Sequence, residues 1–346
     1  MHKGRILITG GLGFIGSGLA MCLLENGYDV SIIDFAKTQL AKEVETKLQE
    51  TAEKNKVSLL VSHSDIIMMN RISTLGKLDI KNVTTVVHCA AFKSIAMSID
   101  DPIGFYHNNV CSTLELLKVC QEYDNIKKFI FSSTAAVYDP KLWFCTEEDV
   151  KVTGCDKPYG CQTKNSDPYS GSKLIDEQLI KEFGKKTGKE IIIFRYFNPI
   201  GSYKKLVCDI SDSMFGNGFR AVENNENFHI FGGDYDTRDG TCLRDYVDLR
   251  DIIDAHIRVI VQDYPSEVSE GKVSPIFNLG TGTHLSVLDC CKIIKKFVPD
   301  FKWDTIERRQ GDGVAGIAIV EKMRLIYGWT AKYTVENTIK DYLNIK

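Results

Sequence analysis

A glycine-rich turn near the start of the chain constrains the fold more than any other feature. Gly10, Gly13 and Gly16 follow an apolar run at residues 5–9 and open a helix-like stretch. In this spacing the first glycine permits a tight turn, the second lets backbone approach a pyrophosphate, and the third allows close helix–strand packing. The next apolar run, residues 29–34, ends in Asp34, about 20 residues beyond the turn, where a carboxylate accepts hydrogen bonds from ribose hydroxyls. Because an acid there repels a 2′-phosphate, the pattern predicts a site for NAD and not for NADP.

Apolar and amphipathic stretches alternate through the first half of the chain. Strands are predicted at residues 5–9, 29–34, 58–62, 84–90, 128–132 and 190–196, with helices at 15–26, 103–122 and 169–187. Short, nearly continuous apolar runs are typical of strands that are buried on both faces. The alternation of strand and helix therefore predicts an α/β fold with a doubly wound parallel sheet.

The alternation ends at Asn198-Pro199. Shorter elements follow, with helices predicted at 213–223, 249–262 and 286–297 and strands at 228–231 and 276–279. We therefore expect a Rossmann-like NAD-binding domain over residues 1–198 and a smaller, mainly C-terminal α+β substrate lobe over residues 199–346. Some segments of the second part are expected to return to the main sheet, and ligands of such sheets bind at the carboxyl ends of the strands.

The composition narrows the function classes. With 43% hydrophobic and 26% charged residues the chain is typical of a globular protein, and a net charge of −3 provides no broad basic surface for nucleic acid. No run is apolar enough to span a membrane, and no signal-peptide pattern precedes the first strand. The 11 cysteines are irregularly spaced without Cys-x-x-Cys, so we expect reduced thiols in a cytoplasmic protein. No histidine cluster has ligand spacing, so no metal is expected, and His88 is predicted to be a packed core residue.

Tyr169 and Lys173 stand four residues apart in a predicted helix. Positions i and i+4 lie on one helix face, where a phenol and an ammonium can act together. The positive charge favours the phenolate, so we expect the pKa of Tyr169 to fall from its usual ~10 toward neutrality. This pair is a candidate base for taking a proton from an alcohol.

Further blocks follow the glycine turn in a fixed order along nearly the whole chain. They read His88-Cys89-Ala90-Ala91-Phe92-Lys93, Asn108-Asn109-Val110, Ser132-Ser133-Thr134-Ala135-Ala136-Val137-Tyr138, Arg195-Tyr196-Phe197-Asn198-Pro199, Phe231-Gly232-Gly233-Asp234-Tyr235-Asp236-Thr237-Arg238-Asp239-Gly240-Thr241, Arg244-Asp245-Tyr246, Asn278-Leu279-Gly280-Thr281-Gly282 and Arg308-Arg309-Gln310-Gly311-Asp312. With the Tyr169 pair, they resemble the UDP-glucose 4-epimerases of the extended short-chain dehydrogenase/reductase family.

The resemblance implies a role for each matched residue. Tyr169 and Lys173 would be the catalytic pair, and Thr134, where serine is usual, would bond the 4-oxygen of the sugar. The residues implied in cofactor binding are Gly10, Gly13, Phe14, Ile15, Gly16, Asp34, Asp65, Ile66, Lys93, Asn108, Tyr169, Lys173 and Tyr196. Those implied in substrate binding are Thr134, Asn198, Phe231, Arg244, Arg309, Asp312 and Gly316. Two arginines suit a diphosphate, which they can bind bidentately. A homodimer is also implied.

The chain departs from the family pattern at several places. The usual polar loop after Asp34 begins with Phe35, and a helix start that usually carries Asn-Asn reads Asp212-Ser213. Residues 143–166 form a longer segment, which we predict to be a loop that partly covers the sugar pocket. Gly316 falls where the family places a residue beside the C2 substituent of the sugar. Its small size predicts room for an N-acetyl group, unless the glycine merely serves a tight turn or residues 204–219 fill the space.

The resemblance implies a reaction and leaves alternatives open. The reaction is reversible inversion at C4 of a UDP-hexose through a 4-keto sugar, interconverting UDP-glucose and UDP-galactose with NAD as a resident cofactor. Ala135-Ala136 stand where related dehydratases carry an acid pair, so acid–base elimination of water is not expected. The alternatives are a 4-epimerase of another nucleotide sugar (a UDP-N-acetylhexosamine or UDP-pentose), a catalytically silent NAD-sensing protein, or a net oxidoreductase that releases NADH.

Overall fold

The computed structural model describes residues 3–69, 76–149, 167–207, 213–271, 273–309 and 313–345. The chain forms two compact units. Unit 1 consists of Met1–Thr134, Ser166–Phe194 and His256–Ile276, and unit 2 consists of Ala135–Asn165, Arg195–Ala255 and Phe277–Lys346. The polypeptide thus passes between the units several times, whereas the predicted division had one boundary after residue 198. A return of later segments to the first part was anticipated, but the early departure at Ala135 was not.

Unit 1 is built on the predicted doubly wound sheet. Within the described residues, seven strands form one sheet in the order β12-β7-β5-β4-β1-β2-β3. The strands are β1 (Arg5–Thr9), β2 (Asp29–Ile33), β3 (Leu59–Ser62), β4 (Val83–His88), β5 (Lys128–Thr134), β7 (Glu190–Tyr196) and β12 (Ile276–Leu279). β1 pairs in parallel with both β2 and β4. The order of the strands therefore reverses beside β1, and this is where an α/β sheet opens a crevice for a ligand.

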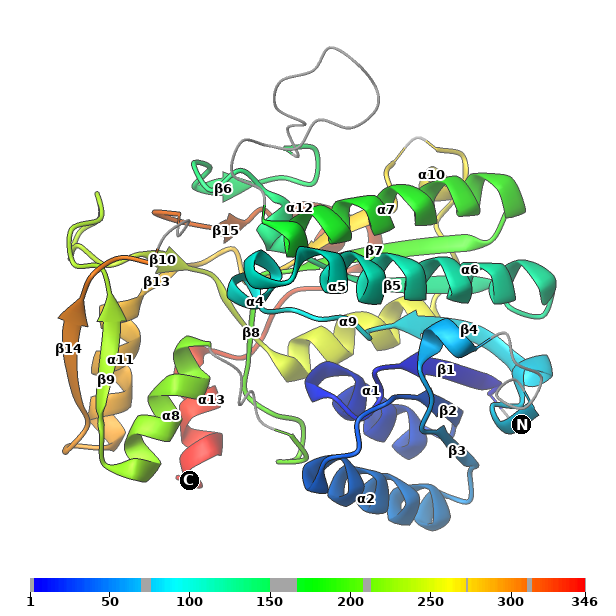
Figure 1. Cartoon of the computed structure of the whole chain (residues 1–346), viewed down its shortest axis with the longest axis horizontal. Coiled ribbons are helices and arrows are strands. Elements are labelled where there is room, and N and C mark those ends of the chain that lie inside the picture. Colours follow the sequence, from blue (N-terminus) through cyan, green and yellow to red (C-terminus); the bar gives the residue numbers. More distant parts are fainter. Residues whose placement is uncertain are drawn as a thin grey trace. The chain divides into compact units, whose positions relative to one another are not determined.

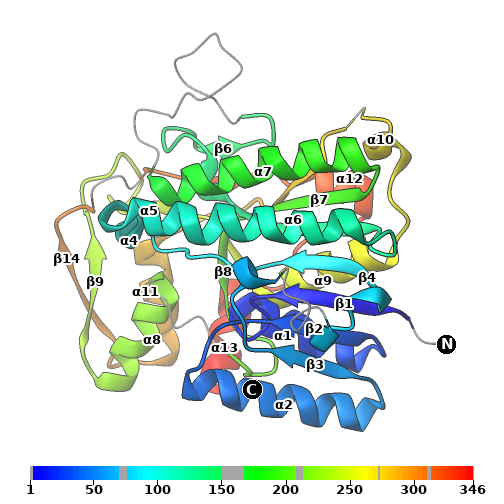
Figure 2. The same ribbon diagram turned by 45° about the vertical axis from the view of Figure 1, so that its right-hand side comes forward.

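The predicted apolar runs are strands because both of their faces are buried. All five residues of β1 are buried, and its Leu7 packs with Val86, Phe129 and Ile193 of neighbouring strands in one hydrophobic core. Helices cover both sides of this sheet (Figure 1 and Figure 2). α1 (Phe14–Glu25) and α2 (Gln39–Asn55) lie on one side, and α4 (Ile95–Asp100), α5 (Pro102–Tyr106), α6 (Ser112–Glu122) and α7 (Pro168–Thr187) on the other.

The predicted helix at 103–122 is interrupted. α5 ends at Tyr106, a π-helical turn spans His107–Cys111, and α6 continues from Ser112. The interruption contains Asn109, which is 1% exposed and directs its side chain inward to bond Phe92 and Ser172. A π turn of this kind is frequent at functional sites, because it redirects side chains without ending the helix.

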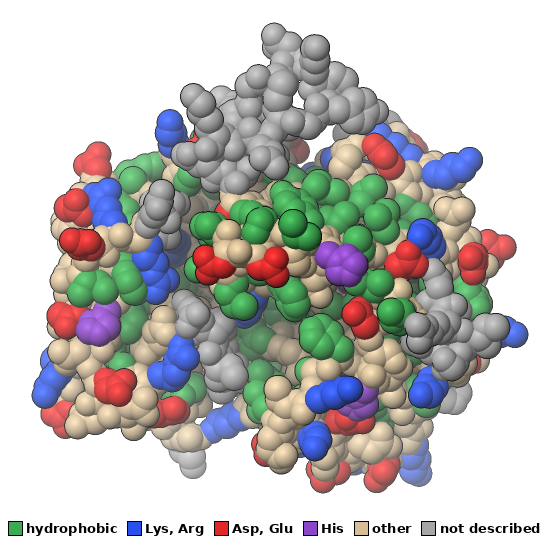
Figure 3. Space-filling view, viewed as in Figure 1, with side chains coloured by type: hydrophobic (Ala, Val, Ile, Leu, Met, Phe, Trp, Pro, Cys, Tyr) green, Lys and Arg blue, Asp and Glu red, His purple; other side chains and the backbone are tan. Residues whose placement is uncertain are grey.

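Apolar side chains gather on the outer face of α4, α5, α6 and α7 (Figure 3). Ile103 is 81% exposed, and Met97, Ile99, Leu114 and Ile175 are also exposed. A contiguous apolar surface of this kind is rare on a monomer and typical of a protein–protein interface. No helix in the described part of the chain is both long and apolar enough to cross a membrane.

Unit 2 has its own core, formed by Phe215, Phe219, Phe228, Ile294 and Ile339 among others. Its strands are β6 (Phe144–Cys145), β8 (Asn198–Ile200), β9 (Asn227–Phe231), β10 (Leu243–Arg244), β11 (Tyr246–Asp248), β13 (Leu285–Ser286), β14 (Lys302–Ile306) and β15 (Ile317–Ala318). Its helices are α8 (Met214–Asn224), α11 (Val287–Phe297), α12 (Glu321–Tyr327) and α13 (Val335–Leu343). Two more helices are α9 (Leu249–Val261), whose residues belong partly to each unit, and the short α10 (Ser266–Ser269) in unit 1.

Candidate active site

The glycine turn has the geometry that a dinucleotide pyrophosphate requires. Gly10 has φ +67°, and a Cβ there would lie 2.8 Å from the backbone nitrogen of Ala90. A Cβ at Gly16 would overlap the carbonyl oxygen of Gly10. Gly13 begins α1, which continues through Phe14 and Ile15, and within the described residues no side chain caps this helix start. The first N–H groups of α1 are thus left for an anion, so the turn fits the predicted cofactor.

Asp34 lies at the end of β2, beside this turn. Its carboxylate accepts hydrogen bonds from the backbone nitrogens of Leu12 (3.0 Å) and Ala36 (2.9 Å). These bonds hold the carboxylate against the loop that connects β1 to α1. Its predicted bond to the ribose stays a prediction.

The other residues predicted to bind the cofactor differ in their exposure and in their positions in the fold. Asp65 accepts a bond from the nitrogen of Ile67 (2.9 Å), whereas the side chain of Ile66 is buried in the core. A contact of Ile66 with adenine is therefore limited to its backbone. Lys93 is exposed in the segment after β4, and Asn108 is half-buried in the π turn with its amide bonded to Asn109. Tyr196 is buried at the end of β7, in unit 2.

Tyr169, Lys173 and Thr134 are brought together at the carboxyl end of β5. Asp167 caps α7 by accepting a bond from the nitrogen of Ser170 (2.9 Å), and this fixes Tyr169 in the first turn. The hydroxyls of Tyr169 and Thr134 share a hydrogen bond. The ammonium of Lys173 is buried and donates to the carbonyl of Ser132 at 2.8 Å. The structure therefore gathers the three predicted catalytic residues in unit 1.

The predicted downward shift in the pKa of Tyr169 is wrong for this structure. Burial of the phenol raises its pKa to about 12; the bond with Thr134 acts in the opposite direction, and the charge of Asp167 adds to the rise. Spacing along the helix does place Lys173 on the same face, but its ammonium is bonded to Ser132 and lies over the ring of Phe131 (4.5 Å). Burial also lowers the pKa of Lys173.

Two buried acids follow Lys173 on α7, and the sequence analysis did not identify them. Asp176 and Glu177 are 1% and 2% exposed, and the hydroxyl of Ser133 donates to Glu177 at 2.5 Å. Burial raises the pKa of Asp176 to about 7, while the charge of Lys173 and a bond with Thr113 act to lower it. Burial thus disfavours the charged form of Asp176, whereas the charge of Lys173 favours it.

A second set of buried polar groups joins β1, β4 and α6. The ring of His88 contacts the hydroxyls of Thr9 (Nδ1, 2.7 Å) and Thr113 (Nε2, 3.0 Å). Thr9 also accepts a bond from the nitrogen of Ala90. His88 is thus a packed core residue, as predicted, and it ties the loop after β4 to the strand that carries the glycine turn.

Asn109 is a positioning residue that the sequence analysis missed. Its side chain accepts from the nitrogen of Phe92 (2.8 Å) and donates to the carbonyl of Phe92 (3.1 Å) and the hydroxyl of Ser172 (2.9 Å). It thereby joins the loop after β4 to the helix of Tyr169. The Asn108-Asn109 pair was the available signal, but sequence alone does not show which asparagine points inward.

Unit 2 carries the residues predicted for the substrate. The guanidinium of Arg309 lies 3.6 Å from the ring centroid of Phe231, so these two residues adjoin as expected. Arg244 donates to the carbonyls of Leu243 (2.8 Å) and Gly313 (3.0 Å), and Asn198 donates to the carbonyl of Asp245 (2.9 Å). Asp312 lies outside the described residues, as does the part of the predicted loop 143–166 beyond residue 149.

Gly316 has open space around it. A Cβ built there would meet no described atom within 4 Å, and the backbone does not have the positive φ that favours glycine. A positive φ therefore does not explain this glycine, and the predicted role beside the sugar stays a prediction. The carbonyl of Gly316 accepts a hydrogen bond from the backbone nitrogen of Asp245 (3.2 Å).

Asp245 organises the surroundings of Gly316, and it too was missed. Its buried carboxylate accepts bonds from the nitrogens of Thr281, Gly282 and Ala318 and from the hydroxyl of Thr281. Burial raises its pKa, while these bonds act to lower it. The carboxylate thus fixes the segments on either side of Gly316 to the end of β12.

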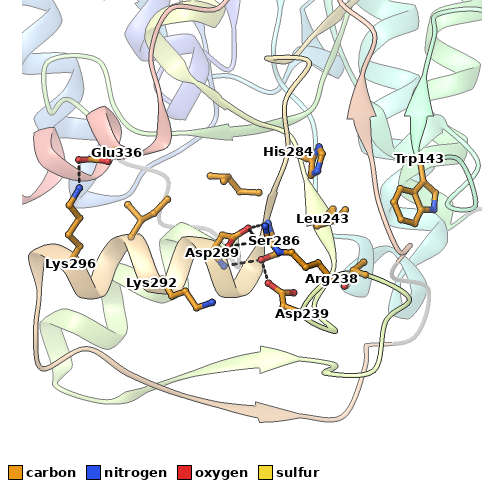
Figure 4. Close-up of a pocket in the computed structure, with 13 residues that line it drawn as sticks. Trp143, Arg238, Asp239, Leu243, His284, Ser286, Asp289, Lys292, Lys296 and Glu336 are labelled. Carbon is orange, nitrogen blue, oxygen red and sulfur yellow. Dashed lines mark hydrogen bonds and ion pairs between the residues drawn. The ribbon is translucent and has the colours of Figure 1, made fainter.

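A hollow of about 670 Å³ opens elsewhere in unit 2 (Figure 4). Trp143 stands at one end of it, Arg238 bonds both carboxylate oxygens of Asp289 at 2.8 Å, and Lys296 pairs with Glu336 at 2.9 Å. No described residue predicted to bind the substrate lines this hollow, and its main charges neutralise each other. We do not assign the substrate to it.

Comparison with known proteins agrees with this arrangement. Residues 6–280 match the model of the NAD dependent epimerase/dehydratase family. A bifunctional UDP-glucose 4-epimerase and UDP-xylose 4-epimerase 1 of Pisum sativum is 30% identical over 98% of this chain and 95% of its own length. The UDP-glucose 4-epimerase of Rhizobium meliloti (strain 1021) is 32% identical, over 96% and 94%.

A comparison with solved structures also finds a UDP-glucose 4-epimerase. UDP-glucose 4-epimerase from Bifidobacterium longum, in complex with NAD+ and UDP, is 31% identical, with a TM-score of 0.80 over 98% of this chain and 97% of that one. The family resemblance of the sequence and the predicted fold class are confirmed. The chain belongs to the NAD dependent epimerase/dehydratase family.

Proposed function

We propose that this protein is an NAD-dependent UDP-glucose 4-epimerase, which interconverts UDP-glucose and UDP-galactose by inverting C4 of the sugar. The observation that carries the proposal is the hydrogen-bonded pair of Tyr169 and Thr134, with the buried ammonium of Lys173 on the same helix as Tyr169. Full-length relatives with this activity support it. The family also contains dehydratases, but Ala135 and Ala136, which follow Thr134, carry no acid for elimination of water.

The residues of unit 1 supply the proton chemistry. Bound NAD supplies the hydride acceptor and donor for C4. Thr134 holds the 4-oxygen of the sugar by a hydrogen bond, and Tyr169 takes the hydroxyl proton and returns it after inversion. Lys173 places a positive charge behind this pair. In this proposal Thr134 orients the sugar hydroxyl, Tyr169 transfers its proton, and the charge of Lys173 stabilises the phenolate.

The residues of unit 2 hold the nucleotide. Arg244 and Arg309 suit the diphosphate, because guanidinium groups bind phosphate oxygens in a bidentate way. Phe231 supports the guanidinium of Arg309 by a cation–π contact. Firm binding of the remote UDP retains the keto intermediate while the sugar turns over between the two half-reactions.

The sugar specificity follows from the open space at Gly316. We propose that the enzyme accepts UDP-N-acetylglucosamine and UDP-N-acetylgalactosamine as well as the unsubstituted pair. A 4-epimerase specific for another nucleotide sugar is the second candidate, and the same open space favours it. Because the backbone at Gly316 accepts side chains, substitutions there test the pocket without straining the fold.

The deciding experiment incubates the purified protein with a panel of UDP-sugars and identifies the products by NMR. The wild type should interconvert both pairs, Gly316→Ala should resemble it, and Gly316→Tyr should lose the N-acetylated pair while retaining UDP-galactose. Equal loss of both activities in Gly316→Tyr would contradict the pocket. A wild type that carries NAD but turns over no sugar would be a silent NAD-sensing protein, and release of NADH in proportion to product would indicate a net oxidoreductase.

We further propose a homodimer in the cytoplasm, acting in galactose metabolism. The exposed apolar face of α4–α7, which includes the highly exposed Ile103, supports self-association. Eight described cysteines carry free thiols, which is the usual state in a reducing compartment. Light scattering should give twice the chain mass for the wild type and a monomer for Ile103→Glu.

A further inference from the structure

We propose that Phe35 and Phe92 form an aromatic bridge across the glycine turn and thereby slow the release of NAD. The inference rests on the cofactor binding in the proposed function. It concerns a property that the catalytic residues do not determine, namely how long the cofactor stays bound between turnovers.

The contact joins two loops that flank the cofactor crevice. Phe35 directly follows Asp34 at the end of β2, and Phe92 lies in the loop after β4. The rings meet edge to face, with centroids 6.5 Å apart. In the sheet β2 and β4 are the two neighbours of β1, and the glycine turn follows β1. A contact between these two loops must therefore pass over the carboxyl end of β1.

Both rings retain much apolar surface despite this contact. Phe35 is 53% exposed and Phe92 is 40% exposed. Exposed phenylalanines on both sides of a crevice that begins with uncapped N–H groups leave apolar area for a ligand that has flat rings as well as phosphates. A dinucleotide has both features, which an inorganic anion lacks.

The two rings differ in how firmly they are held. Phe92 is fixed through its backbone, because its N–H and its carbonyl both bond the side chain of Asn109. Its ring also packs edge to face on the buried ring of Phe105, with centroids 5.5 Å apart. Phe35 projects from the loop before α2, and more than half of its surface is exposed.

This asymmetry gives the bridge a fixed side and a movable side. Phe35 can change rotamer without opening the core, and exposed side chains do so on a picosecond to nanosecond timescale. The backbone of Phe92 cannot shift without breaking the Asn109 bonds, and its ring cannot turn away without losing its contact with Phe105. Release of NAD then requires the Phe35 ring to turn away, and a cofactor that is regenerated in each turnover benefits from such retention.

The test is the release rate of bound NAD. Protein loaded with a fluorescent etheno-NAD is mixed with excess NAD, and the loss of bound fluorescence is followed. Phe35→Ala should release the analogue up to about tenfold faster, the scale of one aromatic pair. Leu40→Ala, which truncates an exposed apolar side chain in α2, is the matched control and should release it at the wild-type rate.

A double-mutant cycle identifies the contact itself. If the two rings act through one bridge, Phe35→Ala/Phe92→Ala should release NAD no faster than the faster single variant. Multiplicative effects would show two independent contacts and overturn the bridge, as would an unchanged rate in Phe35→Ala. Absence of bound NAD in the wild type would instead remove the proposed function along with the inference, so the two failures are distinguishable.

Discussion

Replacing His88 by glutamine should flatten the dependence of stability on pH. His88 is 1% exposed, and burial together with the charge of Lys173 lowers its pKa from 6.5 to about 3. The one hydroxyl proton of Thr113 faces two acceptors, the carbonyl of Asn109 and the carboxylate of Asp176, so the Thr113 oxygen accepts from Nε2 of His88, and Nδ1 accepts from Thr9. This hydrogen-bond pattern matches the neutral ring.

The sign and size of the effect follow from proton linkage. The folded-state pKa of His88 lies below its unfolded value, so the unfolded state binds more protons between the two. The contribution to stability is fully present above about pH 6.5 and is lost as pH falls toward 3. One pKa unit corresponds to about 1.4 kcal/mol, so the wild type should lose about 2 kcal/mol from this residue on going to pH 5.

The assay is urea unfolding of wild type and His88→Gln at pH 7.5 and pH 5, with equal NAD saturation. Imperfect hydrogen bonds should lower the free energy of unfolding of the variant by about 1–3 kcal/mol at both pH values. Between pH 7.5 and pH 5, however, the variant should lose about 2 kcal/mol less of this free energy than the wild type. Asp176 contributes the opposite slope, because its raised pKa favours the folded state at low pH. That contribution is common to both proteins. His107→Gln, at an exposed histidine, is the control. Equal pH slopes in wild type and His88→Gln would refute the reasoning.

Two further predictions concern the catalytic residues. Tyr169→Phe should keep the bound NAD but lower turnover by at least ~10²-fold, measured as product formed per loaded enzyme; turnover within a few-fold of the wild type would remove Tyr169 as the base. Thr134→Ser should be nearly neutral because it keeps a hydroxyl, whereas Thr134→Val should lower kcat, and equal kcat values for the serine and valine variants would show that the hydroxyl has no role.

The main sheet could be predicted because strands that are buried on both faces have nearly continuous apolar sequences. Residues 191–196 are a run of apolar side chains interrupted by one arginine, and β7 covers this run together with Glu190, as predicted. The short strands of unit 2 lack such a run, and β14, for example, consists only of exposed and half-buried positions. The partner of β14 is β9, which is distant in the sequence, so local sequence patterns do not reveal this pairing.

The residues of the site were easier to predict than their environment. Motifs identified Tyr169, Lys173 and Thr134, and the structure brings them together. The buried acid Asp176 and the inward-facing Asn109 could not be predicted, because each depends on the packing of α7 against a helix far away in the sequence. The periodicity of residues 103–122 fits an uninterrupted helix, and it does not reveal the π turn or the tertiary bonds that Asn109 makes from it.

The high pKa of Tyr169 links catalysis to ligand binding. With its pKa raised by burial, Tyr169 is mainly the neutral phenol at pH 7. A base of that kind is inefficient, so its pKa must fall when the site is filled. Burial is the main cause of the rise, and ligands do not relieve it, so the reduction must come from added positive charge or new hydrogen bonds to the oxygen. An oxidised nicotinamide ring carries such a charge, and Lys173 gains influence if it exchanges its bond to Ser132 for one nearer the phenol. We therefore expect Tyr169 to stay protonated in the ligand-free arrangement and to become the proposed base only when ligands are bound.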